Sequence, residues 1–246
     1  MAGEIARTPV PDDVTLCVTS CARPDLLGDT LASFRRYHSI SRMIVSEDSG
    51  DPRMRDWLAQ NCPGATILFG PVKTGMMASI DRLYGAVETP YIFHLEDDWA
   101  FDGPVDFAAA KAALDADATI SVVCVRVFGE LKGKHRARAA ARAAHGLDLR
   151  FMPADAHPQW YGYTSNPGTL RKAFWEVHRP VARFKHDELS QAAKAKGWRV
   201  AYAAPGVARH IGIGRHVADP FQPRAGKLGW LKRGLRAARQ RLGLLP

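Results

Sequence analysis

Short β-branched segments alternate with longer helix-like segments through the first half of the chain. Strands are predicted at residues 14–19, 42–46, 65–69, 91–95 and 120–125, and helices at residues 24–37, 52–61, 74–87 and 104–114. Pro24, Pro52 and Pro104 each stand where a first-turn proline is tolerated. This alternation is typical of an α/β fold in which helices cover a mostly parallel sheet.

The composition excludes several other classes of protein. Hydrophobic residues at 46% and charged residues at 24% are ordinary for a soluble globular chain of 246 residues. No run of about 18 uncharged apolar residues occurs, and residues 1–13 lack an apolar segment, so we expect neither a transmembrane helix nor a secretory signal. The four cysteines form no CxxC pair, which argues against a zinc site or a disulfide framework. We therefore expect a cytoplasmic protein.

Positive charge is concentrated at the C-terminal end. The net charge is +9, and residues 224–246 contain seven basic residues and no acid, whereas the other 223 residues contain 27 basic and 25 acidic ones. Leucines recur in this tail at helical spacing, which predicts a basic amphipathic helix over residues 226–246. Such a helix either lies on an anionic membrane or docks on its own catalytic domain with its charges in solvent.

Three consecutive carboxylates follow the predicted strand at residues 91–95. Glu96, Asp97 and Asp98 repel one another, and near a buried strand they stay ionised only if a cation or hydrogen-bond donors offset them. The simplest such partner is Mg²⁺ or Mn²⁺, which one or two carboxylates hold while substrate phosphates complete the shell. The triplet therefore predicts a metal and a phosphorylated ligand. A solvated acidic turn is the alternative.

Two other predicted strands also end in charged residues. Arg23 follows the first strand, and Glu47 and Asp48 follow the second. Because ligands on parallel sheets bind beyond the carboxyl ends of the strands, we expect Arg23, Asp48 and, by its position, Lys73 to contact a phosphorylated ligand. Instead of contacting a ligand, Arg23 and Lys73 could be solvated surface charges. Asp48 could equally belong to an ordinary turn.

The second half of the chain has a different character. Residues 126–150 are rich in Ala, Arg and Lys and predict a mobile loop followed by a short basic helix. Further helices are predicted near residues 169–178 and at 187–196, and a strand at 199–203. Residues 209–216 place two histidines and two arginines between glycines, as expected of a loop that closes over a ligand. Within it, His210 is a candidate metal ligand and Arg215 a candidate phosphate contact.

The order of these parts resembles the GT-A fold of nucleotide-sugar-dependent glycosyltransferases, over residues 14–216. Residues 18–23 look like the family's first strand and the turn under the nucleotide, and residues 44–50 look like its second strand. Glu96-Asp97-Asp98 is similar to the family's DxD motif, with Glu96 in the first acidic place. Bacterial family 2 enzymes and the N-acetylglucosaminyltransferase I type both resemble the chain in this way.

The resemblance implies a metal-dependent hexosyl- or N-acetylhexosaminyl-type transferase. The expected reaction transfers a sugar, with inversion, from a nucleoside-diphosphate sugar to a hydroxyl group of a glycan or glycolipid. The expected donor is foremost a UDP-sugar, and the expected pathway is envelope synthesis. Glu96, Asp98 and His210 are then expected to hold Mn²⁺ or Mg²⁺. Asp187 or Glu188 is expected to be the catalytic base, although acids are also favoured at helix starts for capping. The expected donor contacts are Arg23, Asp48, Lys73, Asp97 and Arg215.

The same resemblance implies a domain organisation. Residues 1–223 form one catalytic domain, with residues 14–125 as the half that binds the nucleotide sugar and 126–223 as the acceptor side, followed by the tail at 224–246. Trp160, Tyr161 and Tyr163 are candidates for a platform under an acceptor sugar, or for core packing. If the tail binds membrane, the protein is peripheral on the inner face of the cytoplasmic membrane.

Three other functions fit parts of the sequence. A sugar-nucleotidyltransferase would carry a glycine-rich signature after the first strand, and residues 20–24 contain no glycine. A nucleic-acid-binding module is suggested by the pI of about 9.6, but no known motif accompanies the charge, so nucleic acid is not an expected partner. An inactive relative that acts as a scaffold is opposed by the intact acidic motif.

Overall fold

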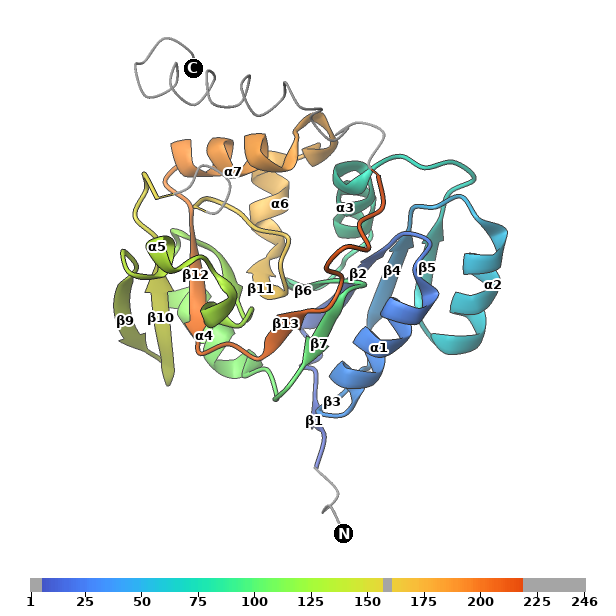
Figure 1. The fold of residues 1–246 in the computed structure, drawn as a ribbon, viewed down its shortest axis with the longest axis horizontal. Coiled ribbons are helices and arrows are strands. Elements are labelled where there is room, and N and C mark those ends of the chain that lie inside the picture. Colours follow the sequence, from blue (N-terminus) through green and yellow to red (C-terminus); the bar gives the residue numbers. More distant parts are fainter. Residues whose placement is uncertain (1–5, 157–160, 219–246) are drawn as a thin grey trace.

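A nine-stranded mixed sheet runs through the computed structural model, which describes residues 6–156 and 161–218 (Figure 1). Across the sheet the strands are β5 (Thr66–Phe69), β4 (Met43–Glu47), β2 (Val14–Ser20), β6 (Tyr91–Glu96), β11 (Gly168–Arg171), β8 (Ile120–Cys124), β12 (Arg199–Ala204), β10 (Leu147–Phe151) and β9 (Ala140–Ala144). The first four are parallel to one another, and β8 is parallel to β12. The α/β sheet predicted from the sequence is therefore confirmed.

Helices cover both faces of this sheet. They are α1 (Pro24–Arg35), α2 (Pro52–Asn61), α3 (Met76–Gly85), α4 (Phe107–Ala116), α5 (Gly133–Arg136), α6 (Lys172–His178) and α7 (His186–Ala195). Alternate residues of a strand point to opposite faces, so Leu16 and Val18 pack with α1 while Cys17 packs with α3 and α6. None of the described helices is long and apolar enough to span a membrane.

Strand β11 was not predicted, because its residues continue directly into α6 and read as one helix. It pairs antiparallel with β6 on one side and with β8 on the other. A Cβ at Gly168 would overlap backbone atoms of β8. Strand β11 can therefore lie this close to β8 only because residue 168 is glycine. The prediction of a helix from residue 169 is therefore wrong at its start, and the helix begins at Lys172.

The prediction of a mobile loop and a basic helix at residues 126–150 is largely wrong. A 3-10 turn (Phe128–Glu130) and the four-residue α5 precede a hairpin of β9 and β10. The turn of this hairpin is His145-Gly146, and both residues have positive φ, 53° and 81°, as a tight two-residue turn requires. Pairing with β10 at the sheet edge outweighs the helix propensity of the alanines in β9.

Two small sheets complete the fold. β1 (Thr8–Pro9) pairs with β3 (His38–Ser39), and β7 (Trp99–Phe101) pairs antiparallel with β13 (Ala208–His210). The second pair brings His210 opposite Trp99, immediately after the acidic triplet. Two segments more than a hundred residues apart in the sequence therefore meet at the end of β6.

Candidate active site

A cavity of about 610 Å³ opens at the carboxyl ends of β2, β4 and β6. Seven residues singled out from the sequence line it: Arg23, Asp48, Lys73, Glu96, Asp97, Asp98 and His210. Arg215, Asp187 and Glu188 are not among the described residues that line it. Parallel strands bring charged side chains from distant segments to one edge, which is where ligands bind on such sheets.

Arg23, in the turn between β2 and α1, is the main counter-charge of the acidic triplet. Its Nη1 lies 2.8 Å from Asp98 Oδ2, its Nε lies 3.2 Å from Asp97 Oδ2, and its Nη2 donates to Asp97 Oδ1. The backbone N–H of Cys21 also donates to Asp97, at 3.1 Å. The sequence indicated that a cation or hydrogen-bond donors must offset these carboxylates, and a guanidinium group of the chain itself does so.

His210 reaches the same carboxylate from the other side. Its Nε2 lies 3.3 Å from Asp98 Oδ2, and its ring packs on Trp99 with the centroids 5.2 Å apart. The hydrogen bond to Asp98 raises the pKa of His210. Burial acts to raise the pKa of Asp98, but His210 and Arg23 outweigh it and hold that pKa below its usual value. Asp98 is therefore ionised at neutral pH.

Gly212 allows the chain after β13 to approach Asp98 closely. The N–H of Ile211 donates to the backbone oxygen of Asp98 at 2.9 Å, and a Cβ at Gly212 would overlap the Asp98 carboxylate. Only glycine leaves room for this carboxylate between β7 and the chain after β13.

Glu96 and Asp97 differ from Asp98 in the direction in which their pKa is shifted. Burial, together with the charge of Asp98, raises the pKa of Glu96 to about 8. Burial also raises the pKa of Asp97, to about 6, against the opposing effect of Arg23. Glu96 accepts hydrogen bonds from Trp99 Nε1 at 3.2 Å and from Ser165 Oγ at 3.4 Å. The three carboxylates therefore differ in pKa, and Asp98 is the one most fully ionised at neutral pH.

Solved structures match this fold, although no protein-family model and no curated protein matches the sequence. The crystal structure of GalNAc-T7 with UDP, GalNAc and Mn²⁺ matches with a TM-score of 0.55 at 12% identity, over 82% of this chain and 44% of that one. Crystal structures of S. aureus TarS 1–349, free and in complex with UDP, match with TM-scores of 0.50 and 0.51 at 10% identity. Both matches include 80% of this chain. They include 60% of the free TarS chain and 59% of the TarS chain in complex with UDP. The chain has the GT-A fold.

At these identities the likeness is one of fold, and the chain spans about half of the length of the proteins it matches. The fold prediction made from the acidic triplet and the strand order is thus confirmed. The GalNAc-T7 structure contains Mn²⁺, and the donor atoms at the end of β6 decide which residues of this chain would suit such a metal.

Asp98 and His210 are the residues best arranged for such a metal. Within residues 6–156 and 161–218, no three His, Cys, Asp or Glu side chains are grouped as metal ligands. The Glu96 carboxylate accepts hydrogen bonds from Trp99 and Ser165 instead. A carboxylate and an imidazole that face one cavity suit Mn²⁺, and Mg²⁺ or Mn²⁺ sites with one or two protein ligands are completed by phosphate oxygens and water. The donor set fits a metal with two protein ligands.

The other predicted donor contacts lie around this centre, each with a partner. Asp48 accepts from the N–H groups of Thr74 and Gly75 at 2.8 and 2.7 Å, so it holds the loop before α3 as a wall of the cavity. Lys73 Nζ donates to the backbone oxygen of Ala218 at 2.5 Å. Arg215 pairs with Asp25 at 2.5 Å, and its carbonyl accepts from Arg23.

The start of α7 holds the two candidate bases. Glu188 accepts from the backbone N–H of Lys185 at 3.0 Å, which is the capping role that acids have at helix starts. His186 Nε2 accepts from the N–H of Ser165 at 3.3 Å, and Ser165 Oγ reaches Glu96. The segment that carries Asp187 is therefore linked to the acidic triplet through Ser165.

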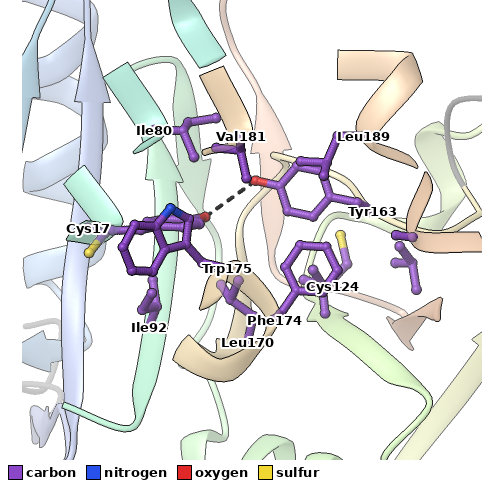
Figure 2. Packing of buried hydrophobic residues seen from close by; sticks show 14 of the residues in the cluster. Cys17, Ile80, Ile92, Cys124, Tyr163, Leu170, Phe174, Trp175, Val181 and Leu189 are labelled. Carbon is purple, nitrogen blue, oxygen red and sulfur yellow. Dashed lines mark hydrogen bonds between the residues drawn. The ribbon is translucent and has the colours of Figure 1, made fainter. Parts of the chain in front are cut away.

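Tyr163 belongs to the core, so of the two alternatives expected for it, acceptor platform or core packing, core packing is confirmed. It is fully buried, stacks on Phe174 with the ring centroids 5.2 Å apart, and its hydroxyl lies 3.4 Å from that of Tyr84 (Figure 2). Tyr161 is partly buried, and the Lys194 ammonium lies 5.4 Å from its ring centroid. Trp160 and the tail at 226–246 lie outside the described residues.

Arg126 and Asn166 line the cavity and were missed in the sequence. Arg126 Nη1 donates to Asn166 Oδ1 at 3.2 Å, and the guanidinium lies 5.4 Å from the centroid of the Trp99 ring. A signal for Arg126 was present, because it directly follows the predicted strand at 120–125, as Arg23 follows the first strand. No such signal existed for Asn166, which is placed by the unpredicted strand β11.

Proposed function

We propose that the chain is a glycosyltransferase that moves a sugar from a nucleoside-diphosphate sugar to an acceptor hydroxyl. One observation carries the proposal: in a GT-A fold, a cavity of about 610 Å³ is lined by an ionised carboxylate at the end of β6 and by several cationic side chains. A departing diphosphate carries negative charge that such cations stabilise. Arg23 and Lys73 are the proposed contacts of its oxygens, because a guanidinium matches them in a bidentate manner and an ammonium attracts them as a point charge.

A UDP-sugar is the proposed donor. GalNAc-T7 was crystallised with UDP, GalNAc and Mn²⁺, and TarS with UDP, at the same fold. Asp98 and His210 are the proposed holders of Mn²⁺ or Mg²⁺, which when bound supplies positive charge to the leaving diphosphate. The chain's own residues orient the donor, with Asp48 fixing the wall of the cavity before α3.

Asp187 is the proposed base that takes the proton of the attacking hydroxyl, with inversion at the sugar. Two observations favour it over Glu188: the Glu188 side chain caps the start of α7, and the neighbouring His186 joins this helix start to the Ser165 loop beside Glu96. A carboxylate that is able to accept a proton from the acceptor is the usual requirement of such a transfer.

Ligand-induced stabilisation of the full chain tests the proposal. UDP and UDP-sugars with Mn²⁺ are expected to raise the melting temperature of the wild type, since a ligand that binds the native state alone stabilises it. Asp98→Asn is expected to lose this rise, and Asp56→Asn, on the exposed face of α2, to keep it. No rise with any uridine, guanosine or thymidine diphosphate sugar in the wild type would overturn the proposal.

A further inference from the structure

Residues 126–150, which lead from the cavity to the β9–β10 hairpin, concentrate positive charge. This segment contains seven Lys and Arg and two acids, and the rest of residues 1–223 contains 20 basic and 23 acidic residues. A local excess of five positive charges therefore lies in a body that is otherwise slightly negative. An uneven distribution of this kind attracts anions to one part of the surface.

Three side chains make up the exposed part of this charge. Lys132, Lys134 and Arg136 are exposed, and none of them has an ion pair with another described residue. Their exposed neighbours Arg138 and Arg142 differ, because they pair with Asp155 and Asp117. The three cations, hereafter the basic surface, are thus available to an anion from outside the described chain.

The basic surface begins at the rim of the cavity. Arg126 lines the cavity, and its Nε lies 3.4 Å from an oxygen of Glu130. Lys132 follows Glu130 by two residues, a span of at most about 7 Å of chain. Leu131 and His135 are buried, which holds the segment against the body of the protein. The chain therefore runs from Arg126, which lines the cavity, to all three cations within ten residues.

We propose that the acceptor is an anionic glycan, with phosphate or carboxylate groups next to its reacting end that contact Lys132, Lys134 and Arg136. This inference rests on the proposed function and names its acceptor class. Charge complementarity supports it, because a neutral acceptor would gain nothing from three unpaired cations beside the site. Residues 129–150 contain no Phe, Tyr or Trp, and sites for single-stranded nucleic acids combine cations with such rings, on which the bases stack, which favours a glycan over nucleic acid.

Binding of a matched pair of oligosaccharides tests the inference. The probes are fluorescently labelled hexagalacturonate, which carries carboxylates, and its neutral methyl ester, each measured by anisotropy on the full chain with saturating UDP and Mn²⁺ to occupy the donor site. The variant is K132Q/K134Q/R136Q. Its control is R7Q/R36Q/R42Q, which removes three exposed arginines near the amino ends of the strands and gives the same net charge.

The wild type and the control are expected to bind the charged probe at least about tenfold more tightly than the ester, with the difference falling as salt rises. The basic-surface variant is expected to lose most of this preference and to keep its melting temperature and its UDP-induced stabilisation. Equal binding of the two probes by a wild type that binds UDP would overturn the inference and leave the proposed function intact. Tighter binding of oligothymidylate, or of phosphatidylglycerol vesicles, through the same three residues would also overturn it.

Failure of UDP to stabilise the wild type would instead overturn the proposed function. The assignment of an anionic acceptor would fall with it, even if the charged probe were preferred, because the basic surface would then have no donor site beside it. The two failures are therefore distinguished by the UDP measurement on the same protein samples.

Discussion

Arg23 and His210 share one oxygen of Asp98. Arg23 Nη1 lies 2.8 Å and His210 Nε2 lies 3.3 Å from Asp98 Oδ2, so two donors from opposite ends of the chain meet on the atom best placed for a metal. A divalent cation that binds this oxygen must displace at least one of them. The guanidinium therefore stabilises the metal-free protein and would compete with a metal bound at this oxygen.

Arg23→Met should separate these two roles. The free energy of unfolding without metal is expected to fall by about 3–5 kcal/mol, because two largely buried carboxylates lose their counter-charge. Affinity for Mn²⁺ alone is expected to rise about tenfold, since its competitor is gone. Chemical denaturation and calorimetric titration with Mn²⁺ measure the two quantities. Arg55→Met, on exposed α2, serves as the control, and an unchanged Mn²⁺ affinity in Arg23→Met would contradict competition.

Gly212→Ala should damage the site through shape alone. The new Cβ would overlap the Asp98 carboxylate, and relieving such a clash typically costs about 1–3 kcal/mol of stability. Because Asp98 must then move, UDP-induced stabilisation in Mn²⁺ is expected to be lost as well. Gly129→Ala is a suitable control, since its Cβ would meet only Val127 Cγ1 at 3.8 Å. Retention of the UDP effect in Gly212→Ala would show that the close approach at residue 212 is dispensable.

Local patterns predicted the parts of the fold that local sequence determines. The parallel strands β2, β4 and β6 and the charged residues at their ends follow from β-branched runs and from the rule that ligands bind beyond strand ends. Strand β11 could not be predicted in this way, because its pairing partners β6 and β8 lie far away in the sequence. The β9–β10 hairpin is local, but the alanines of β9 favour a helix, and β10 also pairs with the distant strand β12. The role of Arg23 as counter-cation likewise depends on a contact across 75 residues, which no spacing in the sequence reveals.

Asp187→Asn and Glu188→Gln should behave differently if Asp187 is the base. Removal of a general base typically slows the reaction by about 10²–10⁴-fold, and Asp187→Asn is expected to do so without changing UDP binding. Glu188→Gln is expected to lower stability by about 1 kcal/mol or less, because it weakens only the helix cap. Release of UDP in the presence of an acceptor measures turnover. A fully active Asp187→Asn enzyme would remove Asp187 from the proposed mechanism.

The tail at residues 226–246 should decide whether the protein binds membrane. Its leucines at helical spacing and its basic residues favour contact with anionic lipid, where each cation near the surface contributes roughly 1 kcal/mol. The full chain is therefore expected to sediment with phosphatidylglycerol vesicles at low salt, and a chain that ends at residue 225 to stay in the supernatant. Neutral phosphatidylcholine vesicles are the control. Equal sedimentation of both chains would leave the tail without a role at the inner face of the cytoplasmic membrane.

His38 should make stability fall as the pH falls. It is buried, its Nδ1 lies 3.2 Å from the Thr8 carbonyl, and its Nε2 accepts from the N–H of Val105 at 2.9 Å, so the folded protein requires a neutral ring. Burial lowers the pKa of His38, and the hydrogen bond to Thr8 opposes this only in part. Below about pH 6.5, the pKa of histidine in the unfolded chain, the unfolded chain binds a proton at His38 and the folded chain does not. The contribution of neutral His38 to stability is therefore complete above about pH 6.5 and is lost on acidification.

His38→Gln removes the titration but keeps an acceptor for Val105. The free energy of unfolding of this variant, measured with urea between pH 7.5 and 5, is expected to depend on pH less steeply than that of the wild type, by up to about 1.4 kcal/mol per pH unit for one proton. His145→Asn, in the exposed hairpin turn where asparagine tolerates the positive φ of 53°, is expected to keep the wild-type slope. Parallel curves for His38→Gln and the wild type would mean that His38 takes up its proton equally in both states, against the contacts of both ring nitrogens.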